Sequence, residues 1–249
     1  MFPQILYFYL GAIIGSFLNV VIYRLPNQQS IISPRSHCIN CKKMIPAYFN
    51  LPIISYLMLL GRCNKCRNKI SFQYPFVEII TGLLFSLTLT NFSLYESIII
   101  NIIICIFICI ALIDFQHFII PLQLIIINFC LILIFCFFFS LSFYYHFLGM
   151  VIGFTYLFSI FCITWFFSKK QPMGYGDLLL IIVLGLWLGP LKILLAIFFA
   201  SLLGLAYWIF LSLNHGYNKN LKIPFGTFLI IASIFLFSTK INQGLFNIF

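Results

Sequence analysis

The sequence contains only four acidic residues, Glu78, Glu96, Asp114 and Asp177, and each lies beside or within a long apolar segment. A carboxylate beside hydrocarbon is energetically costly, so each one is a candidate for a functional role. Asp114 ends one long apolar run and Asp177 opens another. In an aspartic protease, one ionised carboxylate takes a proton from water while a protonated one donates a hydrogen bond to the scissile carbonyl. We therefore predict that Asp114 and Asp177 form a catalytic pair.

Two glycines precede the second aspartate in the run Gly174-Tyr175-Gly176-Asp177. Because glycine lacks a Cβ, we expect Gly174 and Gly176 to permit backbone conformations that strain other residues. We also expect them to let a substrate strand approach Asp177 closely. The alternative is a glycine-rich turn in which Asp177 only caps the next helix. A second aspartate at a similar place in the sequence pattern favours the catalytic interpretation.

The other two acids receive different interpretations. Glu96 falls in a short turn between two apolar runs, where we expect a solvated surface residue. Glu78 lies near the start of an apolar run that follows a basic segment. Both a salt bridge to Arg62 or Arg67, worth little if exposed, and a functional role remain open for Glu78.

Four of the nine cysteines form two pairs, Cys38-x-x-Cys41 and Cys63-x-x-Cys66, with 21 residues between them. Each pair places two thiolates on one tight turn, and two such turns complete a tetrahedral Cys₄ zinc site without an open position for chemistry. We predict a structural zinc ion that stabilises this segment. Two disulfides or four free thiols are the alternative. The remaining cysteines lie in apolar runs, where they behave as small hydrophobic residues.

The composition excludes a water-soluble domain. Of the 249 residues, 63% are hydrophobic and 7% are charged, and the mean hydropathy is +1.13. An ordinary soluble domain is roughly 45–50% apolar and about 25% charged. The sequence predicts an all-α polytopic membrane protein with about eight transmembrane helices, because its apolar runs are much longer than transmembrane strands.

Eight apolar segments are candidates for these spans. We expect the one over 178–188 to be the weakest, because Gly189-Pro190 stops it early. The domain organisation we expect is a first transmembrane helix over 1–23, a cytoplasmic cysteine-rich segment over 24–75 and a transmembrane protease domain over 76–249. The predicted spans are Phe2–Tyr23, Phe76–Phe92, Leu94–Ile113, Phe118–Leu141, Phe147–Phe167, Leu178–Leu188, Ile193–Leu213 and Ile223–Phe237.

The basic residues predict the orientation in the membrane. Eight of the 14 Lys and Arg residues lie between Arg24 and Lys69, and cytoplasmic loops carry the excess of such residues. Placing this segment in the cytoplasm puts Asp114 and Asp177 at cytoplasmic helix ends as well. The net charge of +10 lies in short loops beside helix ends. It therefore indicates contact with the lipid bilayer, and we expect no binding of nucleic acid.

Further motifs resemble those of the type IV prepilin peptidases, also called leader peptidases, over nearly the whole chain. In the first half they are residues 15–26 (GSFLNVVIYRLP), 36–41, Asn50-Leu51-Pro52, 55–57, 61–63 and 74–82. In the second half they are residues 111–114 with Pro121, 174–177, Trp187-Leu188-Gly189 and Pro224-Phe225-Gly226. The chain is identified as a member of this family by the number and order of these motifs.

The resemblance implies a bacterial inner-membrane enzyme that removes the leader of type IV prepilins and pseudopilins after a glycine, on the cytoplasmic side. It assigns catalysis to Asp114 and Asp177. It also implies N-methylation of the new N-terminal residue with S-adenosylmethionine as methyl donor, although the sequence has no glycine-rich nucleotide loop for it. Because Asp114 and Asp177 serve proteolysis and Glu96 faces the other side, Glu78 is the candidate for a role in methyl transfer.

Two positions depart from the family pattern, Leu122 where members often have Asp and Leu179 where they often have Lys. Neither change removes a catalytic group. A presenilin-like intramembrane protease is the alternative enzyme, but it would normally have Tyr before its first aspartate and would lack the cysteine segment. The alternative without enzymatic activity is a transporter that uses Asp114 and Asp177 as ion ligands.

Overall fold

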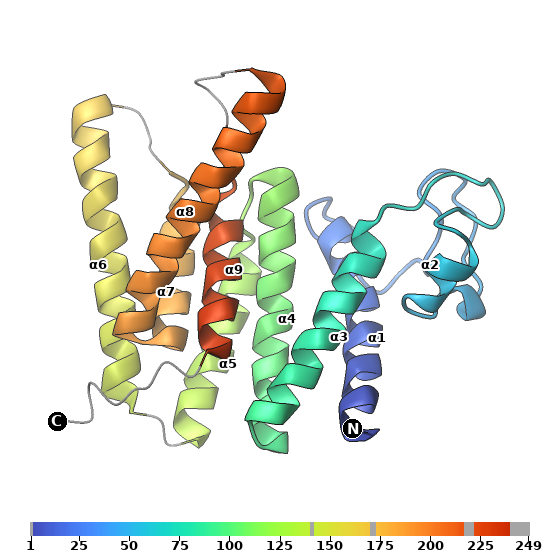
Figure 1. The fold of residues 1–249 in the computed structure, drawn as a ribbon, viewed down its shortest axis with the longest axis horizontal. Coiled ribbons are helices and arrows are strands. Elements are labelled where there is room, and N and C mark those ends of the chain that lie inside the picture. Colours follow the sequence, from blue (N-terminus) through green and yellow to red (C-terminus); the bar gives the residue numbers. More distant parts are fainter. Residues whose placement is uncertain (1, 140–141, 170–172, 217–221, 240–249) are drawn as a thin grey trace. The chain divides into compact units, whose positions relative to one another are not determined.

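The computed structural model describes residues 2–139, 142–169, 173–216 and 222–239 (Figure 1). Regular structure in these ranges is helical apart from two isolated bridges, His37 with Met44 and Arg62 with Lys69. The prediction of an all-α protein is therefore confirmed. The helices are α1 (Phe2–Arg24), the 3-10 helix η1 (Ala47–Phe49), α2 (Ile54–Met58), α3 (Gln73–Asn91), α4 (Leu94–His117), α5 (Leu122–Phe138), α6 (Phe143–Ser168), α7 (Tyr175–Leu188), α8 (Pro190–His215) and α9 (Phe225–Ser238).

Four of these helices are long and apolar enough to cross a membrane, namely α1, α4, α6 and α8. Helices α5, α7 and α9 are apolar but shorter, and α3 is not among the four. Each of the eight predicted segments overlaps one helix, but length and composition identify four spans where about eight were expected. The predicted end of one segment, Leu141, lies outside the described residues.

Local sequence explains where two of the helices begin or end. The Glu96 carboxylate accepts a hydrogen bond from the Ser93 amide (2.9 Å), and the Ser93 hydroxyl accepts one from the Glu96 amide (3.4 Å), which forms a capping box at the start of α4. Glu96 thus lies in the short turn where the sequence predicted it, and it caps the helix that follows. Helix α7 ends at Leu188 because Gly189 has a φ of 78° and Pro190 opens α8. The early stop predicted at Gly189-Pro190 is confirmed.

The chain divides into two compact units, residues 1–105 and 106–249. In the first unit, α1 packs along α3, as Figure 1 shows. A Cβ on Gly11 would lie 2.8 Å from the Gly82 Cα, and one on Gly15 would lie 2.9 Å from the Glu78 Cα. The two helix backbones approach this closely only because these residues are small. The segment with the cysteines connects α1 to α3.

In the second unit, α7 is the central element. It packs against α5, α6, α8 and α9, and every residue from Val183 to Leu188 is buried. Its contact with α6 is close at two glycines, Gly149 and Gly185, where the backbones touch. Because α7 is enclosed in this way, the position of Asp177 in its first turn is fixed by packing on several sides.

Candidate functional site

The structure brings Asp114 and Asp177 together within the second unit, on either side of Gly226. A Cβ built on Gly226 would lie 3.1 Å from Asp114 Oδ2 and 3.1 Å from Asp177 Oδ1. These two oxygens are therefore no farther apart than twice that distance, and the carboxylates repel each other when both are ionised. Asp114 lies in the last turn of α4, Asp177 in the first turn of α7 and Gly226 in the first turn of α9. Three helix ends thus form one site.

The first turn of α9 donates a hydrogen bond to each carboxylate. The Thr227 amide lies 2.8 Å from Asp114 Oδ2, and the Gly226 amide donates to Asp177. Amides in the first turn of a helix have no partner within the helix, and the helix dipole favours negative charge there. A Cβ at this position would lie closer to both carboxylates than ordinary van der Waals contact, so the absence of a side chain at Gly226 lets the two carboxylates flank it. Helix α9 therefore positions both members of the pair.

Thr227 makes a further contact with Asp114 through its hydroxyl. The Thr227 Oγ1 lies 3.0 Å from Asp114 Oδ2 and 2.9 Å from the Ala111 carbonyl oxygen. A hydroxyl has one proton to donate, so it bonds either the carboxylate or the carbonyl at any moment. Sequence reasoning missed Thr227. The only signal for it was its position directly after the motif Pro224-Phe225-Gly226.

Asp177 also contributes to the local structure of its own turn. Its Oδ2 accepts a hydrogen bond from the Gly174 amide at 3.2 Å, while its amide donates to the Gly174 carbonyl at 3.1 Å. The capping interaction that was the alternative interpretation therefore coexists with the contact across Gly226. Gly174 has a φ of −70°, which every residue adopts, so strain does not explain glycine there. At Gly176 a Cβ would lie 3.0 Å from the Ile120 Cβ, so close packing explains that glycine.

The four predicted zinc ligands form one cluster in the first unit. The Sγ atoms of Cys38, Cys41, Cys63 and Cys66 all lie within 4.8 Å of one another. All four are free thiols, and Cys38 Sγ lies 3.8 Å from Cys66 Sγ. A tetrahedral zinc ion with Zn–S bonds of about 2.3 Å requires sulfur atoms about 3.8 Å apart, whereas a disulfide requires about 2.05 Å. The cluster can therefore hold a metal ion.

The two cysteine turns repeat the same backbone geometry. The Lys42 amide donates to the Cys38 carbonyl at 2.8 Å, and the Arg67 amide donates to the Cys63 carbonyl at 3.0 Å. Lys42 and Arg67 each have a positive φ, 53° and 59°. Hydrogen bonds from the Cys66 and Lys65 amides lower the pKa of the Cys63 thiol to about 6. A thiolate is the form that binds metal, so Cys63 is ready to act as a ligand at neutral pH.

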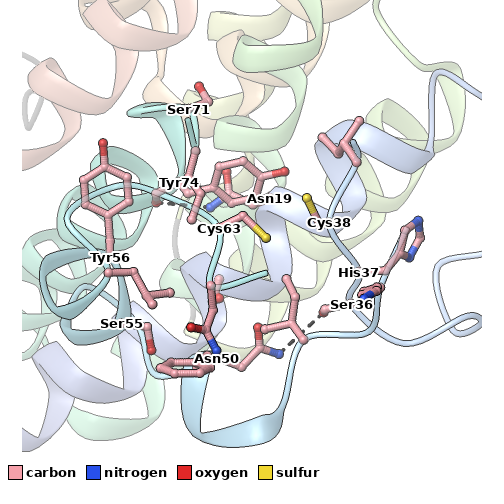
Figure 2. Close-up of a pocket in the computed structure, with 18 of the residues that line it drawn as sticks. Asn19, Ser36, His37, Cys38, Asn50, Ser55, Tyr56, Cys63, Ser71 and Tyr74 are labelled. Atoms are coloured by element: carbon pink, nitrogen blue, oxygen red, sulfur yellow. Dashed lines mark hydrogen bonds between the residues drawn. The ribbon is translucent and has the colours of Figure 1, made fainter. Parts of the chain in front are cut away.

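Glu78 lies in the first unit, whereas the two aspartates lie in the second. It is buried on α3, where its Oε2 accepts a hydrogen bond from the Ile53 amide at 2.7 Å and its carboxylate also bonds the Ser16 hydroxyl. It lines a cavity of about 530 Å³ between α1, the cysteine segment and the start of α3. Figure 2 shows Asn19, Cys38, Cys63 and Tyr74 on the wall of this cavity.

Two family models match successive parts of the chain. Residues 9–92 match the Bacterial Peptidase A24 N-terminal domain, and residues 100–209 match the Type IV leader peptidase family. The first match includes the cysteine cluster and Glu78, and the second includes both aspartates. Gly226 and Thr227 lie beyond the second match.

Several characterised proteins are similar over most of this chain. A Prepilin leader peptidase/N-methyltransferase of Pseudomonas putida is 30% identical over 247 residues, which cover 90% of this chain and 86% of the relative. A Type 4 prepilin-like proteins leader peptide-processing enzyme of Escherichia coli O78:H11 is 34% identical, with coverage of 95% and 93%.

A third relative is longer than this chain. It is a Prepilin leader peptidase/N-methyltransferase of Myxococcus xanthus, 35% identical over 211 residues that cover 84% of this chain and 63% of the relative's length. No solved structure gives a significant match. These similarities decide against the presenilin-like and transporter alternatives. The chain belongs to the type IV leader peptidase family.

Proposed function

We propose that this protein is a membrane aspartic endopeptidase that removes the leader of type IV prepilins and pseudopilins after a glycine. The observation that carries the proposal is the meeting of Asp114 and Asp177 on either side of Gly226, each held by an amide of α9. The names of the relatives supply the substrate class. Asp114 and Asp177 are the catalytic residues in this proposal, and Gly174, Gly176, Gly226 and Thr227 support them.

The chemistry follows from two carboxylates that share one proton. The ionised carboxylate takes a proton from the attacking water, and the protonated one donates a hydrogen bond to the scissile carbonyl oxygen. Water adds to the carbonyl carbon, the C–N bond breaks, and the leaving amine takes up a proton. The Thr227 hydroxyl stabilises Asp114 when that carboxylate is ionised, and it turns to the Ala111 carbonyl when Asp114 is protonated.

The membrane arrangement is part of the proposal. All eight helices that coincide with the predicted segments, α1 and α3–α9, cross the inner membrane in this proposal. The domains are residues 1–23, 24–75 and 76–249, with the segment 24–75 in the cytoplasm. The positive-inside distribution of Lys and Arg supports this orientation. It places Asp114 and Asp177 at the cytoplasmic face.

Zinc is the ion proposed for the cysteine cluster. Four cysteine sulfur atoms within 4.8 Å of one another match the donor set of a structural zinc site, which has no open coordination position. The ion would hold the two cysteine turns together and so order the segment between α1 and α3.

Methyl transfer to the new N-terminal residue is the second proposed activity, supported by the names of the Pseudomonas and Myxococcus relatives. S-Adenosylmethionine would supply the methyl group. Glu78 is the residue proposed to act here, because it is a buried carboxylate on the wall of a cavity. Its carboxylate can hold the ammonium of the cleaved pilin or accept its proton.

The test is to incubate the purified full-length protein with a prepilin, with and without S-adenosylmethionine, and to weigh the products. We expect cleavage after glycine under both conditions and a further mass of one methyl group only with the donor. Intact prepilin after incubation with the folded wild-type protein would refute the proposed protease.

A further inference from the structure

The cavity of about 530 Å³ in the first unit has the size of a small-molecule site. Its wall comes from α1, the cysteine segment and the start of α3, all within residues 16–78. The lining combines aromatic and aliphatic side chains with a few polar groups, as ligand sites do (Figure 2). A pilin helix, with a diameter of about 10 Å, would need a longer groove. The cavity suits a compact ligand.

One buried acceptor on the cavity wall has no partner. Asn19 is 2% exposed, and its amide nitrogen donates to the Gly15 and Tyr74 carbonyl oxygens, both at 3.2 Å. These two bonds fix the orientation of the amide. Its Oδ1 is buried without a hydrogen bond in the described structure. A water-sized molecule in the cavity cannot reach this oxygen, so a ligand could bond it only if the side chains around it moved.

The charges around the cavity have both signs. The partners described for the buried Glu78 carboxylate are neutral groups, the Ile53 amide and the Ser16 hydroxyl. Ile53 has a φ of 63°, a strained conformation for a β-branched residue, so the backbone is held in place to meet this carboxylate. Lys43, Lys65 and Lys69 also line the cavity and are exposed. A ligand that carries both cationic and anionic groups fits this distribution.

We propose that this cavity binds the methyl donor S-adenosylmethionine, with Glu78 complementing its cationic part and the lysines its carboxylate. The proposal rests on the methyl-transfer activity proposed above. In the reaction the sulfonium–methyl bond breaks, an N–CH₃ bond forms on the pilin amine, and that nitrogen releases one proton. The donor leaves as the neutral thioether, S-adenosylhomocysteine, which a carboxylate holds less tightly than the sulfonium.

The test measures equilibrium binding of radiolabelled S-adenosylmethionine and S-adenosylhomocysteine to the purified full-length protein. Val20→Phe fills the cavity from α1, and Ile13→Phe makes the same kind of change on the same helix at a position that is 57% exposed and outside the cavity. We expect Val20→Phe to weaken binding of both compounds by roughly tenfold or more, since filled space cannot hold the ligand. Ile13→Phe should bind like the wild type.

Glu78→Gln tests the charge without changing the volume. Its amide oxygen can still accept the hydrogen bond from the Ile53 amide, so the local fold is kept. Because the substitution replaces a charged carboxylate with a neutral amide, it should weaken S-adenosylmethionine binding by roughly tenfold and S-adenosylhomocysteine binding by less. Equal binding of S-adenosylmethionine by the wild type, Val20→Phe and Glu78→Gln would overturn the proposal.

The same preparations separate this inference from the proposed function. If the wild type cleaves and methylates a prepilin while Val20→Phe and Glu78→Gln keep full affinity for the donor, the cavity assignment fails and the proposed function stands. If the wild type produces no methylated product, the methyl-transfer proposal itself fails. Metal content and gel-filtration profile, measured on each variant, identify any preparation that has not folded.

Discussion

Gly226→Ala is the substitution that probes the arrangement of the aspartate pair most sharply. The added Cβ would lie 3.1 Å from one oxygen of each aspartate and 2.9 Å from the Ile120 Cδ1. Ordinary van der Waals contact begins at 3.4 Å, so the carboxylates or the first turn of α9 must move by a few tenths of an ångström. Alanine is a better helix former than glycine by about 1 kcal/mol, so α9 itself should not be destabilised by its propensity.

The expected result is a large loss of rate in a folded protein. A misplacement of about 1 Å can reduce a rate roughly 10²-fold, so a shift of a few tenths should reduce kcat for leader cleavage by roughly fourfold to tenfold. Gly204→Ala is the matched control, because its Cβ would lie 3.7 Å from the nearest atom, Phe228 Cδ2. Initial cleavage rates of a prepilin by detergent-purified protein provide the assay. Full activity of Gly226→Ala, or an equal loss in Gly204→Ala, would refute the reasoning.

Four further predictions concern the Thr227 hydroxyl, the cysteine cluster and Glu78. Thr227→Val keeps the amide bond to Asp114 but removes the hydroxyl donor, so cleavage should slow by roughly tenfold and its pH profile should shift, whereas an unchanged profile would contradict a role for the hydroxyl. Cys38→Ser should lose about one equivalent of bound zinc and unfold at lower temperature, as metal analysis and thermal melts can show. Because the pKa of the Cys63 thiol is lowered from 9.0 to about 6, the stability it contributes is full above pH 9, declines below it and is lost as the pH falls through about 6. Thermal melts of the metal-free protein at stepwise lower pH measure that decline, and a melting temperature that does not fall between pH 9 and pH 6 would count against it. Glu78→Gln should lower the methylated fraction of the cleaved product, and a fully methylated product would remove Glu78 from the mechanism.

The sequence was sufficient for residues whose type and spacing encode their role. The two Cys-x-x-Cys pairs predicted one cluster because each pair is a local turn, and the structure places the four sulfur atoms together. The end of α7 before Gly189-Pro190 could also be predicted, since it depends on two adjacent residues. The catalytic role of Asp114 and Asp177 remains a prediction, although the structure brings them to one place.

Contacts between distant segments could not be predicted in this way. Thr227 meets Asp114 across 113 residues of sequence, and its amide is available only because it lies in the first turn of α9. Glu78 was expected either to pair with Arg62 or Arg67 or to act chemically. In the structure the Glu78 carboxylate accepts a hydrogen bond from the Ile53 amide. Ile53 has a positive φ, which the conformational preference of isoleucine does not predict. The close approach of α1 and α3 at Gly11 and Gly82 is likewise a property of packing.

The most direct test of the central proposal is the cleavage of a prepilin by Asp114→Asn and Asp177→Asn, each followed by mass spectrometry of the products. An amide cannot accept the proton of the attacking water, so neither variant should produce the shortened pilin, although both should purify as folded protein with wild-type metal content. Glu96→Gln, which changes a carboxylate that only caps α4, is the control and should cleave like the wild type. Shortened pilin at a clear rate from either aspartate variant would contradict the account.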